Sequence, residues 1–105
     1  MLWHIAKIQW KADLSDDMQR QLETELADMG RRLPTIAFFR VTRCIDDDRA
    51  TVVLSGFEDE VAFENYLQDP QHEAIAVRVR EHRVGERLRI DAWTDDPPEA
   101  LKRSL

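Results

Sequence analysis

The order of hydrophobic periodicities along the chain restricts its fold more than any other feature. Residues 2–10 alternate between two faces, the period of two that is typical of a β-strand, and one face carries Leu2, His4, Ala6, Ile8 and Trp10. Residues 18–33 place apolar side chains three and four positions apart, which is the period of an amphipathic helix. Ser15 is the expected N-cap of this helix and Pro34 is expected to end it.

A hairpin is predicted after this first strand and helix. Residues 36–45 and 50–57 are rich in β-branched and aromatic side chains, which indicates two strands. The aspartates at positions 46–48 between them favour a turn.

A helical region interrupted by a proline follows the hairpin. Residues 58–67 predict a short helix, and Asp69 and Pro70 predict a new start, as the N-cap and first position of a segment that runs to about His82. Residues 86–94 predict the last strand. The order β-α-β-β-α-β predicts a ferredoxin-like α+β fold, with a four-stranded antiparallel sheet and the helices on one face.

The second face of this sheet is expected to be covered by another protomer. The strands predicted over residues 36–45 and 50–57 are apolar on both faces, and a one-sided sheet would alternate more cleanly. Two such sheets packed face to face would form a homodimeric α+β barrel. We expect the domain to span residues 1–95 and to be followed by a C-terminal tail, residues 96–105.

Charge and cysteine content exclude several classes of function. The formal net charge is -6, so the protein repels phosphate backbones and we expect no nucleic-acid partner. No apolar run reaches the about 20 residues of a membrane span, so no membrane partner is expected. Cys44 is the single cysteine, which fits a reducing compartment, and we expect a cytoplasmic protein. The three histidines lack the close spacing of a metal site.

Several segments together resemble one known family, the stress-responsive A/B barrel proteins. The opening Met1-Leu2-Trp3-His4-Ile5 and the turn Leu33-Pro34-Thr35-Ile36 are similar to the family's first strand and its helix-to-strand turn. The run from Phe57-Glu58-Asp59 through Tyr66 to Pro70-Gln71-His72 looks like the family's signature, and Arg87-Leu88-Arg89-Ile90-Asp91 resembles its closing strand.

This resemblance implies a homodimer with the fold predicted above. Many members of the family have no assigned activity, and some are implicated in stress responses. A plant member cyclises a polyketide by aldol condensation without a cofactor, with a tyrosine of the short helix and the histidine after the proline as its acid/base pair. Those positions match Tyr66 and His72 here.

Tyr66 and His72 are therefore the candidate catalytic pair, since the helix break can bring their polar ends toward one cavity. Histidine can accept a proton near neutral pH, and the tyrosine hydroxyl can donate to a developing oxyanion. The alternative is that His72 stabilises the start of a helix while Tyr66 packs in the core. The remaining candidate wall of a substrate pocket is apolar apart from His4, and comprises His4, Ala6, Ile8, Leu22, Leu26, Val53, Ile75 and Ala76.

Three functions follow from these residues. The first is cofactor-free binding or acid/base transformation of a small hydrophobic or carbonyl compound, as in a cyclase or isomerase, with His4 as an orienting group. The second is a non-catalytic homodimer with a stress-related or interaction role. The third, a cofactor-free monooxygenase-like activity, is suggested only by other proteins with the same barrel fold. The basic end of the long helical segment, with Arg80, His82 and Arg83, is typical of a solvated helix end.

Overall fold

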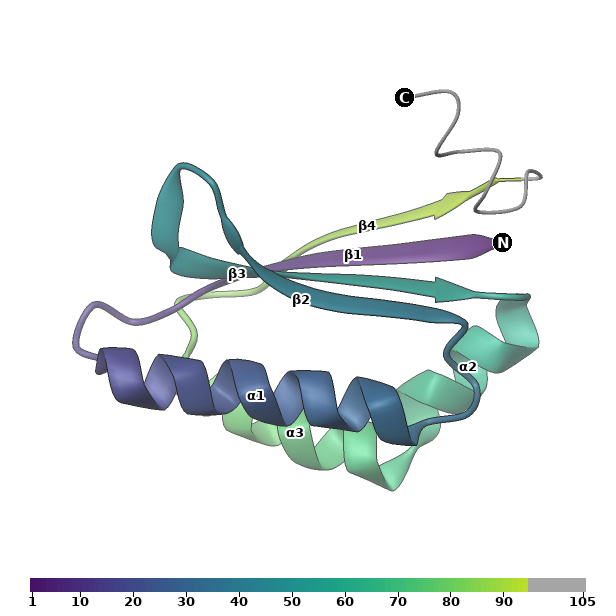
Figure 1. Cartoon of the computed structure of the whole chain (residues 1–105), viewed down its shortest axis with the longest axis horizontal. Coiled ribbons are helices and arrows are strands. Elements are labelled where there is room, and N and C mark those ends of the chain that lie inside the picture. Colours follow the sequence, from purple (N-terminus) through teal and green to yellow (C-terminus); the bar gives the residue numbers. More distant parts are fainter. Residues whose placement is uncertain (95–105) are drawn as a thin grey trace.

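Four strands form one antiparallel sheet in the order β2-β3-β1-β4, in a computed structural model that describes residues 1–94. The elements are β1 (Leu2–Gln9), α1 (Asp16–Arg32), β2 (Phe38–Cys44), β3 (Asp47–Phe57), α2 (Glu60–Gln68), α3 (Pro70–His82) and β4 (Leu88–Trp93). All three helices lie on one face of the sheet (Figure 1). This is the ferredoxin-like arrangement predicted from the sequence, whereas the expected tail 96–105 and the domain boundary at residue 95 lie outside the described residues.

The element boundaries differ from the predicted ones mainly at the hairpin. The turn occupies Ile45 and Asp46 only, and β3 begins at Asp47 rather than at Ala50. Asp47 pairs with Cys44, and an irregularity between Arg43 and Cys44 absorbs the change of register. Aspartates are common in turns, but two of these three, Asp47 and Asp48, lie in β3.

The predicted interruption of the second helical region is confirmed. The Asp69 side chain accepts a hydrogen bond from the Gln71 backbone N–H at 2.8 Å, which caps α3, and Pro70 occupies the first turn of that helix. The same residue closes α2, because its own N–H donates to the Tyr66 carbonyl at 3.2 Å. A single aspartate therefore ends one helix and starts the next.

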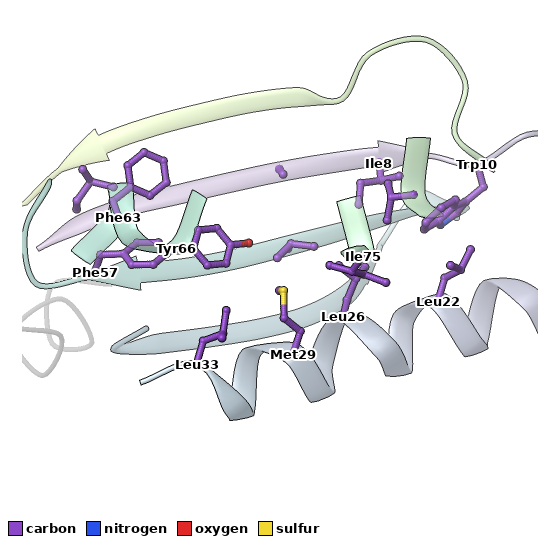
Figure 2. Close-up of a cluster of buried hydrophobic side chains, with 14 residues drawn as sticks. Ile8, Trp10, Leu22, Leu26, Met29, Leu33, Phe57, Phe63, Tyr66 and Ile75 are labelled. Atoms are coloured by element: carbon purple, nitrogen blue, oxygen red, sulfur yellow. The ribbon is translucent and has the colours of Figure 1, made fainter. Parts of the chain in front are cut away.

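The core lies between the helices and the sheet face that β1 presents through its even-numbered residues (Figure 2). β1 pairs with β3 on one side and with β4 on the other, so it is central in the sheet. The buried cluster comprises Leu2, Ala6, Ile8, Trp10, Leu22, Leu26, Met29, Leu33, Val53, Phe57, Phe63, Tyr66, Ile75 and Val79. In the described part of the chain, no helix is long and apolar enough to cross a bilayer.

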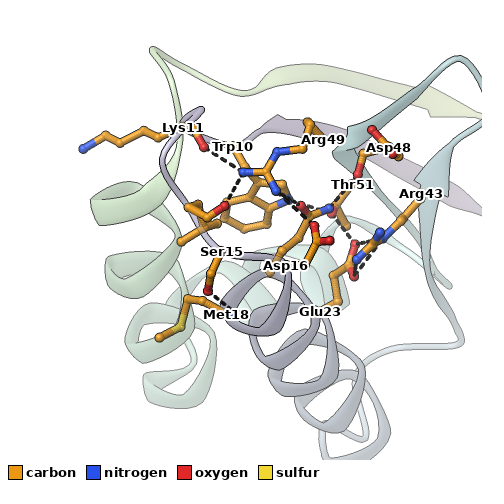
Figure 3. Close-up of polar contacts among 12 residues, drawn as sticks. Trp10, Lys11, Ser15, Asp16, Met18, Glu23, Arg43, Asp48, Arg49 and Thr51 are labelled. Carbon is orange, nitrogen blue, oxygen red and sulfur yellow. Dashed lines mark hydrogen bonds and ion pairs between the residues drawn. The ribbon is translucent and has the colours of Figure 1, made fainter.

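Two polar side chains tie α1 to the sheet (Figure 3). Arg49 of β3 donates to the backbone carbonyls of Lys11 and Leu14 at 2.9 and 2.6 Å, which fixes the connection that leads into α1. Thr51 accepts a hydrogen bond from the Trp10 indole at 2.8 Å and donates to Glu23 of α1 at 2.6 Å. These bonds satisfy buried polar groups and fix the end of the core opposite α2.

The face of the sheet that carries no helix of residues 1–94 is mostly apolar over three strands, with Lys7 of β1 as a charged side chain among them. Trp3 and Ile5 of β1 share it with Val52 and Leu54 of β3, and their register also places Leu88 and Ile90 of β4 there. The β2 part of this face differs from the prediction, because β2 contributes Phe38, Arg40 and Thr42. The adjacent Phe38 and Phe39 point to opposite faces, so β2 is less apolar on this side than its composition indicates.

Gly30 interrupts the helical pattern of α1 because Phe39 packs against it. A β carbon at position 30 would lie 2.1 Å from Cδ1 of Phe39, well inside van der Waals contact. The glycine therefore lowers the helix propensity of α1 but allows β2 to approach it closely.

Gly30→Ala is expected to destabilise the protein despite the better helix propensity of alanine. The propensity gain of about 1 kcal/mol is outweighed by overpacking against the rigid Phe39 ring, so we expect a net loss of about 2 kcal/mol in the free energy of unfolding. Urea unfolding measures this change. In a Phe39→Ala background the same substitution should cost nothing or stabilise, and an equal cost in both backgrounds would contradict the contact.

Candidate functional site

A cavity of about 160 Å³ lies between β1, β3 and α3, and is the candidate site. Its lining combines an apolar wall with two histidines, a tyrosine and three arginines: His4, Ala6, Ile8, Leu26, Val53, Tyr66, His72, Glu73, Ile75, Ala76, Val79, Arg80, Arg83 and Arg87. Three larger surface hollows lie along α1, two beside β2 with volumes of about 470 and 510 Å³ and one beside α3 of about 330 Å³. None of the three contains a histidine, cysteine or tyrosine, so the smaller cavity has the more versatile acid/base chemistry.

The break between α2 and α3 brings Tyr66 and His72 together. Tyr66 lies in the last turn of α2 and His72 in the first turn of α3, and Asp69 caps the junction between them. Their rings are in contact, with centroids 4.4 Å apart and planes inclined at 54°. The ring of Phe57 packs against Tyr66, with 5.0 Å between the ring centroids. The Tyr66 hydroxyl points away from Phe57 and toward Ile75 (Figure 2).

Burial shifts both members of this pair toward their neutral forms. It lowers the pKa of the His72 imidazole below 6.5, although the backbone of Leu67 acts in the opposite direction. Burial also raises the pKa of Tyr66 to about 12. At neutral pH the pair is thus an imidazole that can accept a proton and a hydroxyl that can donate a hydrogen bond.

His72 has an unsatisfied buried atom. Its Nδ1 is inaccessible to solvent and makes no hydrogen bond of acceptable geometry among residues 1–94, although the Leu67 backbone is near enough to the imidazole to raise its pKa. A buried polar atom without a partner costs about 1–3 kcal/mol relative to a paired one, so such atoms are rare and often have a functional reason.

His4 reaches the same cavity from β1 and is held by an acidic partner on β4. Its Nδ1 lies 2.5 Å from Oδ1 of Asp91, whose other oxygen accepts from Nε of Arg89 at 2.9 Å. Burial lowers the pKa of His4 below 6.5, against the opposing effect of Asp91. Burial also disfavours the Asp91 carboxylate, but the hydrogen bonds from His4 and Arg89 outweigh it and hold its pKa below 3.8. Neutral His4 therefore donates from Nδ1 to Asp91 and keeps Nε2 as an acceptor.

The structure brings most of the sequence-predicted site residues to one cavity. Tyr66, His72 and the predicted wall residues line it, with one exception. Leu22 is completely buried in the core and does not reach the cavity, because it lies one helical turn before Leu26, toward the Trp10 end of the core (Figure 2).

Sequence reasoning missed Asp91 and the arginines. The partner of His4 depends on the register between β1 and β4, which no local pattern encodes. The charge pattern of the sequence predicts that Arg80 and Arg83 lie at a solvated helix end. In the structure both line the cavity together with Arg87. Within residues 1–94 there is no cluster of three or more His, Cys, Asp or Glu side chains that could hold a metal ion.

Comparison with known proteins gives both a family and a fold. The profile of the family described as Stress responsive A/B Barrel Domain matches residues 2–93. No curated protein matches the sequence. Among solved structures, an antibiotic biosynthesis monooxygenase is similar with a TM-score of 0.80 and 17% identity, over 91% of this chain and 100% of the other.

Two further structures have the same fold. At3g17210 from Arabidopsis thaliana aligns with a TM-score of 0.78 and 17% identity, over 92% of this chain and 98% of that one. A dimeric ferredoxin-like protein of unknown function from Thermobifida fusca aligns with a TM-score of 0.77 and 18% identity, over 89% and 90% of the two chains. At these identities the likeness concerns the fold and not the activity.

The buried neutral state of His72 predicts that the protein loses stability on mild acidification. Because its pKa is lower in the folded protein than in the unfolded chain, the unfolded chain binds more protons as the pH falls through 6.5. We expect the free energy of unfolding, measured with urea, to fall between about pH 7.5 and about pH 5.5. His72→Gln should reduce this fall.

His82→Gln is the matched control, since His82 lies at the end of α3 outside the cavity lining. It should leave the pH dependence as in the unchanged protein. An equal effect of both substitutions would contradict a special environment for His72.

Proposed function

The chain belongs to the stress-responsive A/B barrel domain family, and we propose that it binds a small carbonyl compound and transforms it by cofactor-free acid/base chemistry. The observation that carries the proposal is the contact between Tyr66 and His72 in a cavity wall, with 4.4 Å between ring centroids. The burial of both groups, which keeps His72 neutral and Tyr66 protonated, supports complementary roles for them.

The proposed reaction begins with removal of a proton from the carbon next to a carbonyl group. The C–H bond breaks, the proton goes to the imidazole of His72, and the electron pair forms the C=C bond of an enolate. The Tyr66 hydroxyl donates a hydrogen bond to the enolate oxygen, where the negative charge develops. Return of the proton at another position gives isomerisation. Attack of the enolate carbon on a second carbonyl forms a C–C bond and an alkoxide, which takes the proton back from His72 to give an aldol addition product, and loss of water from it completes a condensation.

His4 serves as an orienting group in this proposal. Its hydrogen bond to Asp91 fixes the ring and directs the acceptor Nε2 away from β4. His4 lies 6.5 Å from Tyr66 between ring centroids, on the strand that forms the floor of the cavity. An acceptor at this place can hold a substrate hydroxyl or a bound water.

We also propose that the protein is a homodimer, built through the sheet face that carries no helix. Leu88 and Ile90 are 63% and 53% exposed in a single chain, and in the register of the sheet they lie opposite Lys7 and Ile5 of β1. An apolar surface that spans three strands is costly to leave in water, and two copies packed face to face would bury it. The Thermobifida fusca protein of the same fold is described as dimeric, which supports this arrangement.

We further propose that the protein is cytoplasmic and that its domain comprises residues 1–95. Cys44 is the single cysteine of the sequence, so no disulfide can form within it and its stability does not depend on one. A reducing compartment is compatible with such a domain.

Proton exchange tests the chemistry without knowledge of the natural substrate. Acetophenone, a methyl ketone with one ring, is incubated with the protein in D₂O, and exchange of its methyl protons is followed by NMR. We expect the protein to accelerate exchange, His72→Ala to reduce the rate by about 100-fold and Tyr66→Phe by about tenfold, the usual range for acid/base groups.

His82→Ala should leave the exchange rate unchanged and controls for a general effect of imidazole. If the protein does not accelerate exchange in acetophenone or in a panel of other small ketones, the catalytic proposal is wrong. The chain would then be a non-catalytic member of its family.

Ile90→Asp tests the dimer. Its side chain is exposed in one chain, so folding should tolerate the change, whereas burial of a carboxylate at the interface should raise the dimer dissociation constant by at least about 100-fold. Light scattering should report twice the 12.3 kDa of one chain before the substitution and one chain after it. The control is Val61→Asp on α2, where the native side chain is 68% exposed and off the sheet face. A monomeric unchanged protein would refute the homodimer.

A further inference from the structure

The cavity has an apolar wall and a cationic side. Strand β1 and helices α1 and α3 supply its aliphatic side chains, whereas Arg80, Arg83 and Arg87 lie where α3 ends and the chain turns toward β4. The whole chain is acidic, with a formal net charge of -6. The guanidinium groups clustered at this cavity therefore have the opposite sign to the net charge of the protein.

Two of these arginines lack an acidic partner. Arg80 is paired with Glu73 at 3.0 Å, and outside the cavity Arg78 and Arg89 are paired with Glu25 and Asp91 at 2.9 Å each. Among residues 1–94, no carboxylate forms an ion pair with Arg83 or Arg87.

The environment of Arg87 is unfavourable for a cation. Partial burial lowers its pKa, and the charges of Arg89 and Arg83 lower it further, while the effects of Tyr66 and Asp91 in the opposite direction are smaller. A guanidinium that is half-buried beside like charges is stabilised by an anion, and a planar carboxylate matches its hydrogen-bond geometry best.

We propose that Arg83 and Arg87 bind the carboxylate of a small organic acid whose apolar body occupies the cavity. This inference rests on the proposed role of the cavity as a binding site, and it narrows the substrate class from carbonyl compounds to carbonyl compounds that also carry a carboxylate beside a compact apolar body. Because the arginines line the same cavity as Tyr66 and His72, a ligand held by its carboxylate lies within reach of the acid/base pair.

The volume of the cavity limits the size of this acid. It is about 160 Å³, close to the about 150 Å³ of an apolar protein cavity that accepts benzene. One six-membered ring or a short branched chain therefore fills it, and the carboxylate must lie at the arginine side.

Three probes separate the contributions of charge and apolar body. Benzoate has both, benzamide has the same shape without the charge, and acetate has the charge without the ring. Dissociation constants are measured by NMR titration of the ¹⁵N-labelled protein. We expect benzoate to bind about tenfold more tightly than benzamide, as one charge-assisted pair provides, and more tightly than acetate.

Substitutions locate the anion. Arg87→Gln and Arg83→Gln should each remove most of the preference for benzoate over benzamide, and Arg87→Lys should retain part of it. Arg78→Gln is the matched control, because it removes the same charge from α3 at a position outside the cavity lining, and it should keep the preference.

The outcomes distinguish this inference from the proposed function. Equal binding of benzoate and benzamide, or an unchanged preference in Arg87→Gln and Arg83→Gln, would overturn the carboxylate site and leave the acid/base cavity intact. If His72→Ala abolishes proton exchange but keeps the benzoate preference, the carboxylate site stands independently of catalysis. Absence of binding by all three probes would overturn the carboxylate site, whereas the acid/base proposal is decided by the exchange experiment with ketones.

Discussion

The pairing of β1 on both of its edges is the constraint on which the rest of the structure depends. Because β1 lies between β3 and β4, its even-numbered side chains face the helices and its odd-numbered ones face the opposite side. A shift of one residue would exchange the two faces, expose His4 and Ile8, and bury Lys7 against the helices. The register also places Asp91 directly beside His4. The core, the cavity floor and the apolar outer face are therefore consequences of one strand position.

Local patterns in the sequence were sufficient to predict the elements and the helix break. The alternation of residues 2–10 assigned the cavity floor to its correct face, and Asp69 with Pro70 predicted two helices, because capping chemistry acts within a few residues. The resemblance to a family then predicted Tyr66 and His72 as the acid/base pair. Ala6 and Ile8 on β1 followed from the alternation of that strand, whereas Val53 lies on a strand that is apolar on both faces, so alternation alone does not select its side.

Features that depend on distant parts of the chain could not be predicted. Asp91 meets His4 across 87 positions, and the place of Gly30 within a helix is explained by Phe39 of another element, which packs against it. Leu22 and Leu26 share one stripe of α1, but only Leu26 reaches the cavity, which depends on where α3 crosses α1. Arg87 lies in the connection before β4, although alternation predicts it within the last strand, and no local pattern indicates that it lines the cavity.

The pairing between β1 and β4 has a consequence for how the protein is made. β4 is the last of the described elements to leave the ribosome, whereas β1 is the first, and the contact that joins the N-terminal amine to the Thr94 carbonyl spans 93 positions. Until then β1 can pair with β3 only, and its other edge stays open as a template for wrong partners. His4 can meet Asp91 only once β4 has been synthesised, so this contact at the cavity floor requires nearly all of the described chain. Nascent chains are accordingly expected to need protection of that edge during synthesis.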